Sequence, residues 1–101
     1  MDTNKLINIA TKLINKHTPE KQIIKTLEEL SELQKEICKF LLYRESRHIS
    51  TIVEEMVDVQ IMLLQLEMIV LHISENKNIV KDQWEFKINK IEKMLEENQN
   101  A

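Results

Sequence analysis

The sequence of 101 residues contains no glycine, a single proline and few aromatic residues. Tight β-hairpin turns depend on glycine or Asn-Gly pairs, so this composition argues against a sheet built from short hairpins. Leu, Ile, Lys, Glu, Gln and Met dominate the chain, and these residue types favour helix. We therefore expect an all-α protein, and this chain length supports one domain, residues 1–101.

Three further scarcities limit the class of protein. The lone Cys38 cannot form an intrachain disulfide, which fits a reducing cytoplasm, and its apolar neighbours predict a buried structural thiol. The net charge of −3 leaves no basic footprint for nucleic acid. The most apolar run, Val59–Leu71, is too short to span a bilayer, and no signal peptide is recognisable. We expect a soluble cytoplasmic protein that binds neither nucleic acid nor a membrane.

Apolar residues recur at helical spacing in four segments. The clearest start is Thr18-Pro19-Glu20, which offers an N-cap, a proline for the first helical position and an acid in the first turn. Ser46 or Ser50 is the candidate N-cap of the next helix. The predicted helices span about Asp2–Lys16, Thr18 to Tyr43 or Arg44, Ile49–Ser74 and Ile79–Glu97.

The apolar stripes of these segments predict a bundle-like protomer of four helices. The second and fourth segments each carry one stripe expected to be buried: Ile23, Leu27, Leu30, Ile37 and Leu41 in one, and Val80, Trp84, Ile88, Ile91 and Leu95 in the other. The third segment is apolar around nearly its whole circumference, which is typical of a helix buried on all sides. Four helices of one protomer cannot cover it easily, so we expect a homo-oligomer, either a dimer or a tetramer.

Two pairs of acids stand out against this pattern. Glu29 and Glu32 lie in the run EELSEL, and Glu55 and Asp58 lie in EEMVDV. The i, i+3 spacing places each pair on one face of its helix. The residue numbers 29 and 58 add to 87, as do 32 and 55, so an antiparallel hairpin turning near Tyr43 would bring all four acids together.

A cluster of this kind requires a compensating positive charge. Leaving a carboxylate ionised in a dry interior costs several kcal/mol, and the third segment has almost no lysine or arginine after Arg47. A divalent cation is the economical answer, and oxygen ligands favour Mg²⁺ or Mn²⁺ over zinc. Such a site suits displacement at phosphorus. The alternatives are a solvated acidic face and a di-iron site; the latter needs two Glu-x-x-His motifs, and only Glu45–His48 fits.

The paired motif resembles that of the MazG-type all-α nucleoside triphosphate pyrophosphohydrolases, whose signature is ExxE, a variable gap and ExxD. Here the signature reads Glu29-x-x-Glu32 and Glu55-x-x-Asp58, and the resemblance covers about residues 22–90. It implies four helices, dependence on Mg²⁺, and hydrolysis of a nucleoside triphosphate to the monophosphate and pyrophosphate. It also implies that these four acids are the catalytic and metal-binding residues.

The resemblance extends to residues around the acids. Family members often place a Gln and a Lys before the first motif, as Gln22 and Lys25 do here, which implies contacts to substrate and to phosphate. Many carry Lys-x-x-Arg in the last helix, where this chain has Lys87 and Lys90 as implied phosphate-binding residues without the bidentate fork of arginine. The aromatic-glycine element of many members is missing, so the preferred base is not indicated.

A function of another class also fits the sequence. A non-catalytic helical interaction or regulatory module, with a degenerate metal site, would explain the apolar third segment equally well. It would not explain the mirrored register of the acids. Stabilisation of the fold by Mg²⁺ would distinguish the two, because a ligand that binds only the folded state raises its stability.

Overall fold

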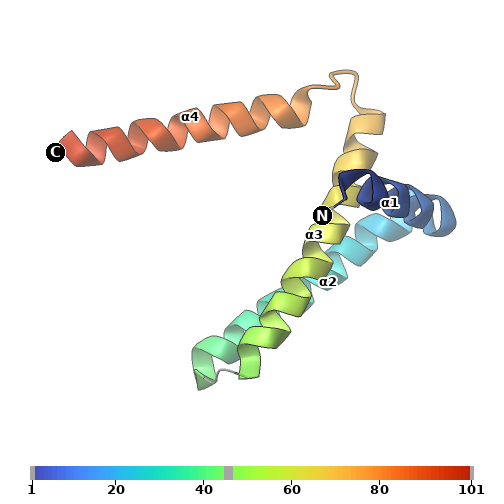
Figure 1. Ribbon diagram of the computed structural model, residues 1–101, viewed down its shortest axis with the longest axis horizontal. Coiled ribbons are helices and arrows are strands. Elements are labelled where there is room, and N and C mark those ends of the chain that lie inside the picture. Colours follow the sequence, from blue (N-terminus) through green and yellow to red (C-terminus); the bar gives the residue numbers. More distant parts are fainter. Residues whose placement is uncertain (1, 45–46, 101) are drawn as a thin grey trace. The chain divides into compact units, whose positions relative to one another are not determined.

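The computed structural model describes residues 2–44 and 47–100. All regular structure in these two ranges is helical, which confirms the all-α class. The helices are α1 (Thr3–His17), α2 (Pro19–Tyr43), α3 (Arg47–Ile73) and α4 (Ile79–Asn100), shown in Figure 1. Their bounds lie close to the predicted ones. Ser50 lies within α3 rather than at its N-cap, and Glu45 and Ser46 fall outside the described residues.

Thr18 joins the first two helices and has an unusual backbone conformation. Its side-chain oxygen accepts a hydrogen bond from the backbone nitrogen of Lys21 at 3.3 Å, which confirms the predicted N-cap of α2. Its φ of 81° and ψ of 150° fall in a region that glycine adopts easily and a β-branched residue does not. At the other end of α2, Arg44 takes a left-handed conformation (φ 52°) and its N–H bonds the Phe40 carbonyl. A chain without glycine therefore uses other residues at both ends of α2.

The chain divides into two compact units, Met1–Ile69 and Val70–Ala101. In the first unit, α2 and α3 run antiparallel and side by side, and α1 packs against α2 (Figure 1). Among the described residues of this unit, few apolar side chains are buried: Ala10, Val59, Met62 and Ile69. Four polar side chains are buried with them, namely Gln22, Thr26, Glu36 and Gln65. The interface between α2 and α3 is therefore partly polar.

The apolar stripe predicted for the core of α2 is exposed in the single chain. Leu27 and Leu41 retain 62% and 55% of their accessible surface, and on α3 Val53 retains 52%. One protomer does not cover α3, as expected for so apolar a helix, and its burial by a second copy stays a prediction. Periodicity identifies the apolar face of a helix, but one chain of this length has too few elements to cover each face. Cys38, expected in the core, is also exposed.

The second unit contains the last residues of α3 and the whole of α4. Lys77 closes the end of α3: its ammonium group donates hydrogen bonds to the carbonyls of Leu71 (2.6 Å), Ser74 (2.7 Å) and His72 (3.4 Å). The predicted stripe of α4 is not buried here, since Trp84 is 66% exposed and Leu95 is 56% exposed. These apolar groups have no cover within the described part of the unit.

The helix α3 has a property that its shorter apolar run did not indicate. By length and composition alone, the stretch His48–Ile73 of α3 could cross a membrane, with a mean hydropathy of 1.7. The shorter run Val59–Leu71 had suggested otherwise. Core helices of soluble proteins pass the same test, so this is weak evidence of a membrane span. The absence of a membrane partner stays a prediction.

Candidate metal centre

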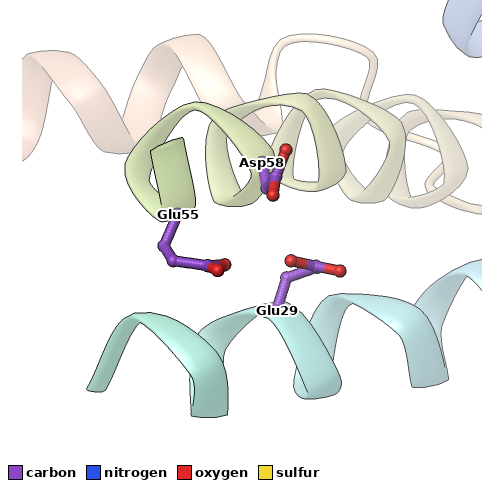
Figure 2. Close-up of side chains that lie close together, drawn as sticks. All are labelled: Glu29, Glu55 and Asp58. Carbon is purple, nitrogen blue, oxygen red and sulfur yellow. The ribbon is translucent and has the colours of Figure 1, made fainter. Parts of the chain in front are cut away.

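Three of the four acids predicted to meet lie together. Glu29 on α2 and Glu55 and Asp58 on α3 each offer a carboxylate oxygen, and these oxygens lie within 4.8 Å of one another. Figure 2 shows the three carboxylates pointing into the same space between the two helices. All three side chains are half-buried. The antiparallel pairing of α2 with α3 thus concentrates negative charge at one point.

Glu55 is the most constrained of the three. Its Oε2 atom is buried, and no group in the described residues donates a hydrogen bond to it. Loss of solvent raises the pKa of Glu55, and the charges of Glu29, Asp58, Glu32 and Glu54 raise it further. A buried carboxylate oxygen without a partner requires a hydrogen-bond donor, a bound proton or a cation.

Glu32, the fourth predicted ligand, is exposed and lies outside this group. Three residues correspond to about 300° of helical rotation, so Glu32 lies roughly 60° around α2 from Glu29. Thr26, only 4% exposed, lies about the same angle on the opposite side of Glu29. The face of α2 that packs against α3 therefore includes Thr26 and not Glu32. The charge of Glu32 nevertheless acts on Glu55 and raises its pKa.

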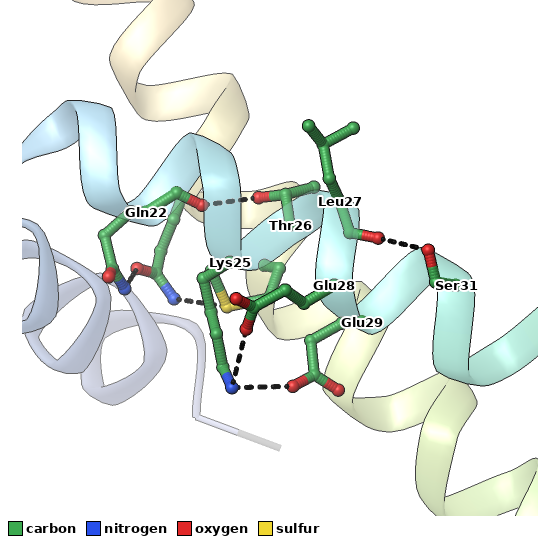
Figure 3. A network of polar contacts seen from close by, with 9 residues as sticks. Gln22, Lys25, Thr26, Leu27, Glu28, Glu29 and Ser31 are labelled. Carbon is green, nitrogen blue, oxygen red and sulfur yellow. Dashed lines mark hydrogen bonds and ion pairs between the residues drawn. The ribbon is translucent and has the colours of Figure 1, made fainter.

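Lys25 supplies a positive charge beside the acids. Its ammonium nitrogen lies 3.2 Å from a Glu29 oxygen and 3.5 Å from a Glu28 oxygen, as Figure 3 shows. Its bonds to Glu29 and then to Glu28 raise the pKa of the ammonium group. About half of the Lys25 side chain is exposed, so water screens the attraction strongly. No ion pair with Glu55 or Asp58 is found among the described residues.

A pair of amides continues the same register one turn beyond Lys25. The Nε2 atom of Gln22 donates a hydrogen bond to Oε1 of Gln65 at 2.7 Å. Gln65 is completely buried and Gln22 is 7% exposed. The two residue numbers again add to 87. The resemblance implied a contact of Gln22 with substrate, and Gln65 was not predicted, although the same sum of residue numbers points to it as the counterpart of Gln22.

An open cavity of about 550 Å³ extends from the acidic cluster between α1, α2 and α3. Glu29 and Asp58 form part of its wall, and Gln22 and Lys25 line it as well. Two further groups able to carry positive charge, His17 and Lys21, also reach it. His17 is the last residue of α1 and is half-buried. The wall of the cavity therefore carries both acidic and basic groups.

Lys87 and Lys90, the other predicted phosphate ligands, belong to α4 in the second unit and are exposed. Lys87 borders an apolar cavity of about 380 Å³ formed with Val70, Val80 and Trp84. The role of both lysines in binding phosphate stays a prediction.

The three clustered acids fit a hard divalent cation. All the donor atoms are carboxylate oxygens, which Mg²⁺ and Mn²⁺ prefer, and no thiol or imidazole belongs to the cluster within the described ranges. The unpaired buried oxygen of Glu55 is the atom that a cation would satisfy. Three ligands also leave coordination positions for water or phosphate oxygens, as Mg²⁺ sites in enzymes usually do.

Comparisons of the chain with models of protein families, with curated proteins and with solved structures found no match.

Proposed function

We propose that this protein is an Mg²⁺-dependent nucleoside triphosphate pyrophosphohydrolase of the MazG type. The observation that carries the proposal is the cluster of Glu29, Glu55 and Asp58, two of whose acids, Glu29 and Asp58, line an open cavity that basic groups line as well. A nucleoside triphosphate with its cation needs both kinds of group, because acids bind the metal ion and basic groups bind the anionic polyphosphate. Mn²⁺ would satisfy the same ligands.

The residues that would hold the cation are Glu29, Glu55 and Asp58. Glu32, whose charge acts on Glu55, would contribute only if its side chain turned toward the cluster. When bound, the cation neutralises phosphate charge and polarises the phosphoryl group that reacts. Lys25, which lines the cavity, is the residue that would contact the phosphates. In the metal-free protein its ammonium group pairs with Glu29, and a cation at the cluster would weaken that pairing and release Lys25 toward the cavity.

The reaction would be attack of water on the α-phosphorus. A new bond forms from the water oxygen to this phosphorus, and the bond to the oxygen bridging the α- and β-phosphorus atoms breaks, so that pyrophosphate leaves. One carboxylate of the cluster accepts the proton of the attacking water as general base. Lys25, and Lys87 or Lys90 as predicted from the sequence, would stabilise the charge that develops on the phosphates.

Association of protomers is part of the proposal. The exposed stripes of α2 and α4 and the exposed residues of α3 leave apolar surface uncovered, and large apolar surfaces mark sites of association. A second copy would cover these faces in a dimer or tetramer. So small a protomer also has limited wall for a nucleotide, so residues from a neighbouring copy would complete the binding of the base.

Pyrophosphate release from a panel of common ribo- and deoxyribonucleoside triphosphates, with Mg²⁺, tests the activity. Glu55→Gln should fold normally and lose turnover, because the amide keeps the shape of the side chain but removes the charge. Glu54→Gln is the matched control, since Glu54 is the exposed neighbour outside the cluster. Full turnover by the Glu55→Gln variant would refute the assignment of these acids.

The alternative function is a non-catalytic helical interaction module. The observation that favours it is the same exposed apolar surface, which a partner helix could cover as well as a second copy could. A module of this kind would release no pyrophosphate from any nucleotide, and its melting temperature would not respond to Mg²⁺.

A further inference from the structure

The buried amide of Gln65 can take only one orientation. Its Nε2 atom donates to the backbone carbonyl of Ile61 at 3.4 Å and lies 3.5 Å from the sulfur of Met62. A backbone carbonyl accepts hydrogen bonds but cannot donate them. Rotating the Gln65 amide by half a turn would place two oxygens against each other in a completely buried position.

This orientation determines that of Gln22. Because the nitrogen of Gln65 donates to Ile61, its oxygen faces α2. Gln22 must therefore donate its own Nε2 to that oxygen. The Oε1 atom of Gln22 is then left over as an acceptor, and the described residues provide no donor for it. Gln22 lines the cavity, where a ligand can supply that donor. The backbone carbonyl of Ile61 thus determines, through the two amides, that Gln22 offers an acceptor to the cavity.

We propose that Gln65 is a positioning residue that fixes Gln22 as a hydrogen-bond acceptor, and that the ligand is a nucleotide whose base carries an exocyclic amino group, as cytosine and adenine do. This inference rests on the proposed function, because it takes the acidic end of the cavity as the place of the phosphates. A base with a carbonyl at the same position would bring two acceptors together.

The position of Gln22 suits a base rather than a sugar. Gln22 lies seven residues before Glu29 on α2, which corresponds to roughly 10 Å along the helix axis. In a nucleotide, the edge of the base lies about this far from the phosphates, whereas the sugar hydroxyls lie closer to them. Leu13, Ile24, Ile61 and Met62 also line the cavity and offer apolar surface to the faces of a ring. Such a wall with one oriented polar group is typical of a selective site.

A simpler role for the amide pair is to hold α2 against α3, with no effect on the ligand. The two roles differ in what removal of Gln65 changes. If the bond is purely structural, removing Gln65 lowers the stability of the protein and leaves the preference between nucleotides unchanged. A positioning role changes the preference between two nucleotides that differ only in an amino group and a carbonyl.

The experiment measures dissociation constants by calorimetry with Mg²⁺ and non-hydrolysable α,β-imido triphosphates, so that turnover is not needed. Two pairs are compared: cytidine with uridine, and adenosine with inosine. The wild-type protein should bind at least one amino-bearing member roughly tenfold more tightly than its oxo counterpart. In Gln65→Met, which keeps the length of the side chain, Gln22 is free to turn over and this ratio should fall toward one.

Gln60→Met is the matched control, because Gln60 is an exposed glutamine on the same helix and should leave the ratio unchanged. Equal or tighter binding of both oxo nucleotides by the wild-type protein would overturn the inference while the proposed function stands. An unchanged ratio in Gln65→Met would overturn the role of Gln65. Binding of no nucleotide at all would overturn the inference together with the proposed function.

Discussion

The amide nitrogen of Gln22 lies 2.7 Å from the amide oxygen of Gln65, which fixes the register between α2 and α3. In two antiparallel helices, residues at the same level have numbers that add to a constant, and for this pair the constant is 87. Glu29 and Asp58 have the same constant, and they lie in one cluster. The amide pair and the acids are therefore consequences of one helix pairing.

Mg²⁺ should stabilise the fold. A ligand at ten times its dissociation constant stabilises the folded state by about 1.4 kcal/mol, which raises the melting temperature of a domain of this size by several degrees. Thermal melting with Mg²⁺ and with a chelator measures the difference. Glu55→Gln should abolish the shift and Glu54→Gln should preserve it. A melting temperature indifferent to Mg²⁺ in the wild-type protein would rule out a metal centre at these acids.

The metal-free protein should show the pH dependence expected of Glu55. Because its pKa is raised in the folded state, ionisation of Glu55 opposes folding. This penalty is absent below the ordinary pKa of a glutamate and complete above the raised one. With a chelator present, Glu55→Gln should therefore melt higher than the wild-type protein at pH 7.5, and the difference should vanish near about pH 4. A difference that grows toward low pH would contradict the predicted sign.

Thr18→Gly should stabilise the protein. The backbone conformation of Thr18 stores roughly 1–3 kcal/mol of strain, and glycine relieves it, while glycine at an N-cap loses only a few tenths of a kcal/mol. The greater freedom of glycine in the unfolded chain offsets about 0.5–1 kcal/mol of this gain in stability. We expect a net gain of about 1 kcal/mol in urea denaturation. Ser31→Gly, in the exposed interior of α2, should instead lose about 0.5 kcal/mol.

Trp84 should report association of protomers. It is the single tryptophan of the chain and is 66% exposed in the protomer, so covering the α4 stripe would shift its fluorescence to shorter wavelength. We expect this shift to grow with protein concentration. Ile91→Lys should weaken it, because the substitution places a charge within the stripe, whereas Asn89→Lys on another face should not. Emission of a solvated tryptophan at every concentration would argue against burial of α4 by a second copy.

The sequence predicted well the features that depend on local chemistry or on register. Thr18 and Pro19 located the start of α2, because capping and the fixed φ of proline act within one turn. The spacing of the acids was enough to place Glu29 against Asp58, since helical periodicity and antiparallel pairing are both regular. The same rule would have identified Gln65 as the counterpart of Gln22.

Features that depend on what covers a surface could not be predicted. The stripe containing Leu27 was expected in the core, but periodicity does not say which element packs on a face. The place of Cys38 was misjudged for the same reason. The exposure of Glu32 depends on where the contact line crosses α2, which the spacing of the acids leaves undetermined within a fraction of a turn.

The acids of α3 also bear on where this helix can reside. A carboxylate at the centre of a lipid-embedded helix opposes insertion by about 2.5–3.5 kcal/mol, and Glu55 and Asp58 lie in the first half of the apolar stretch His48–Ile73. The part after them, Val59–Ile73, covers roughly 22 Å as a helix, less than the ~30 Å of hydrocarbon in a bilayer. Replacing both acids with leucine would lower this barrier, although Glu54 and Glu67 would remain, and would favour insertion of the helix into lipid. The inactivity of such a variant would then reveal nothing about catalysis, whereas glutamine substitutions avoid the problem.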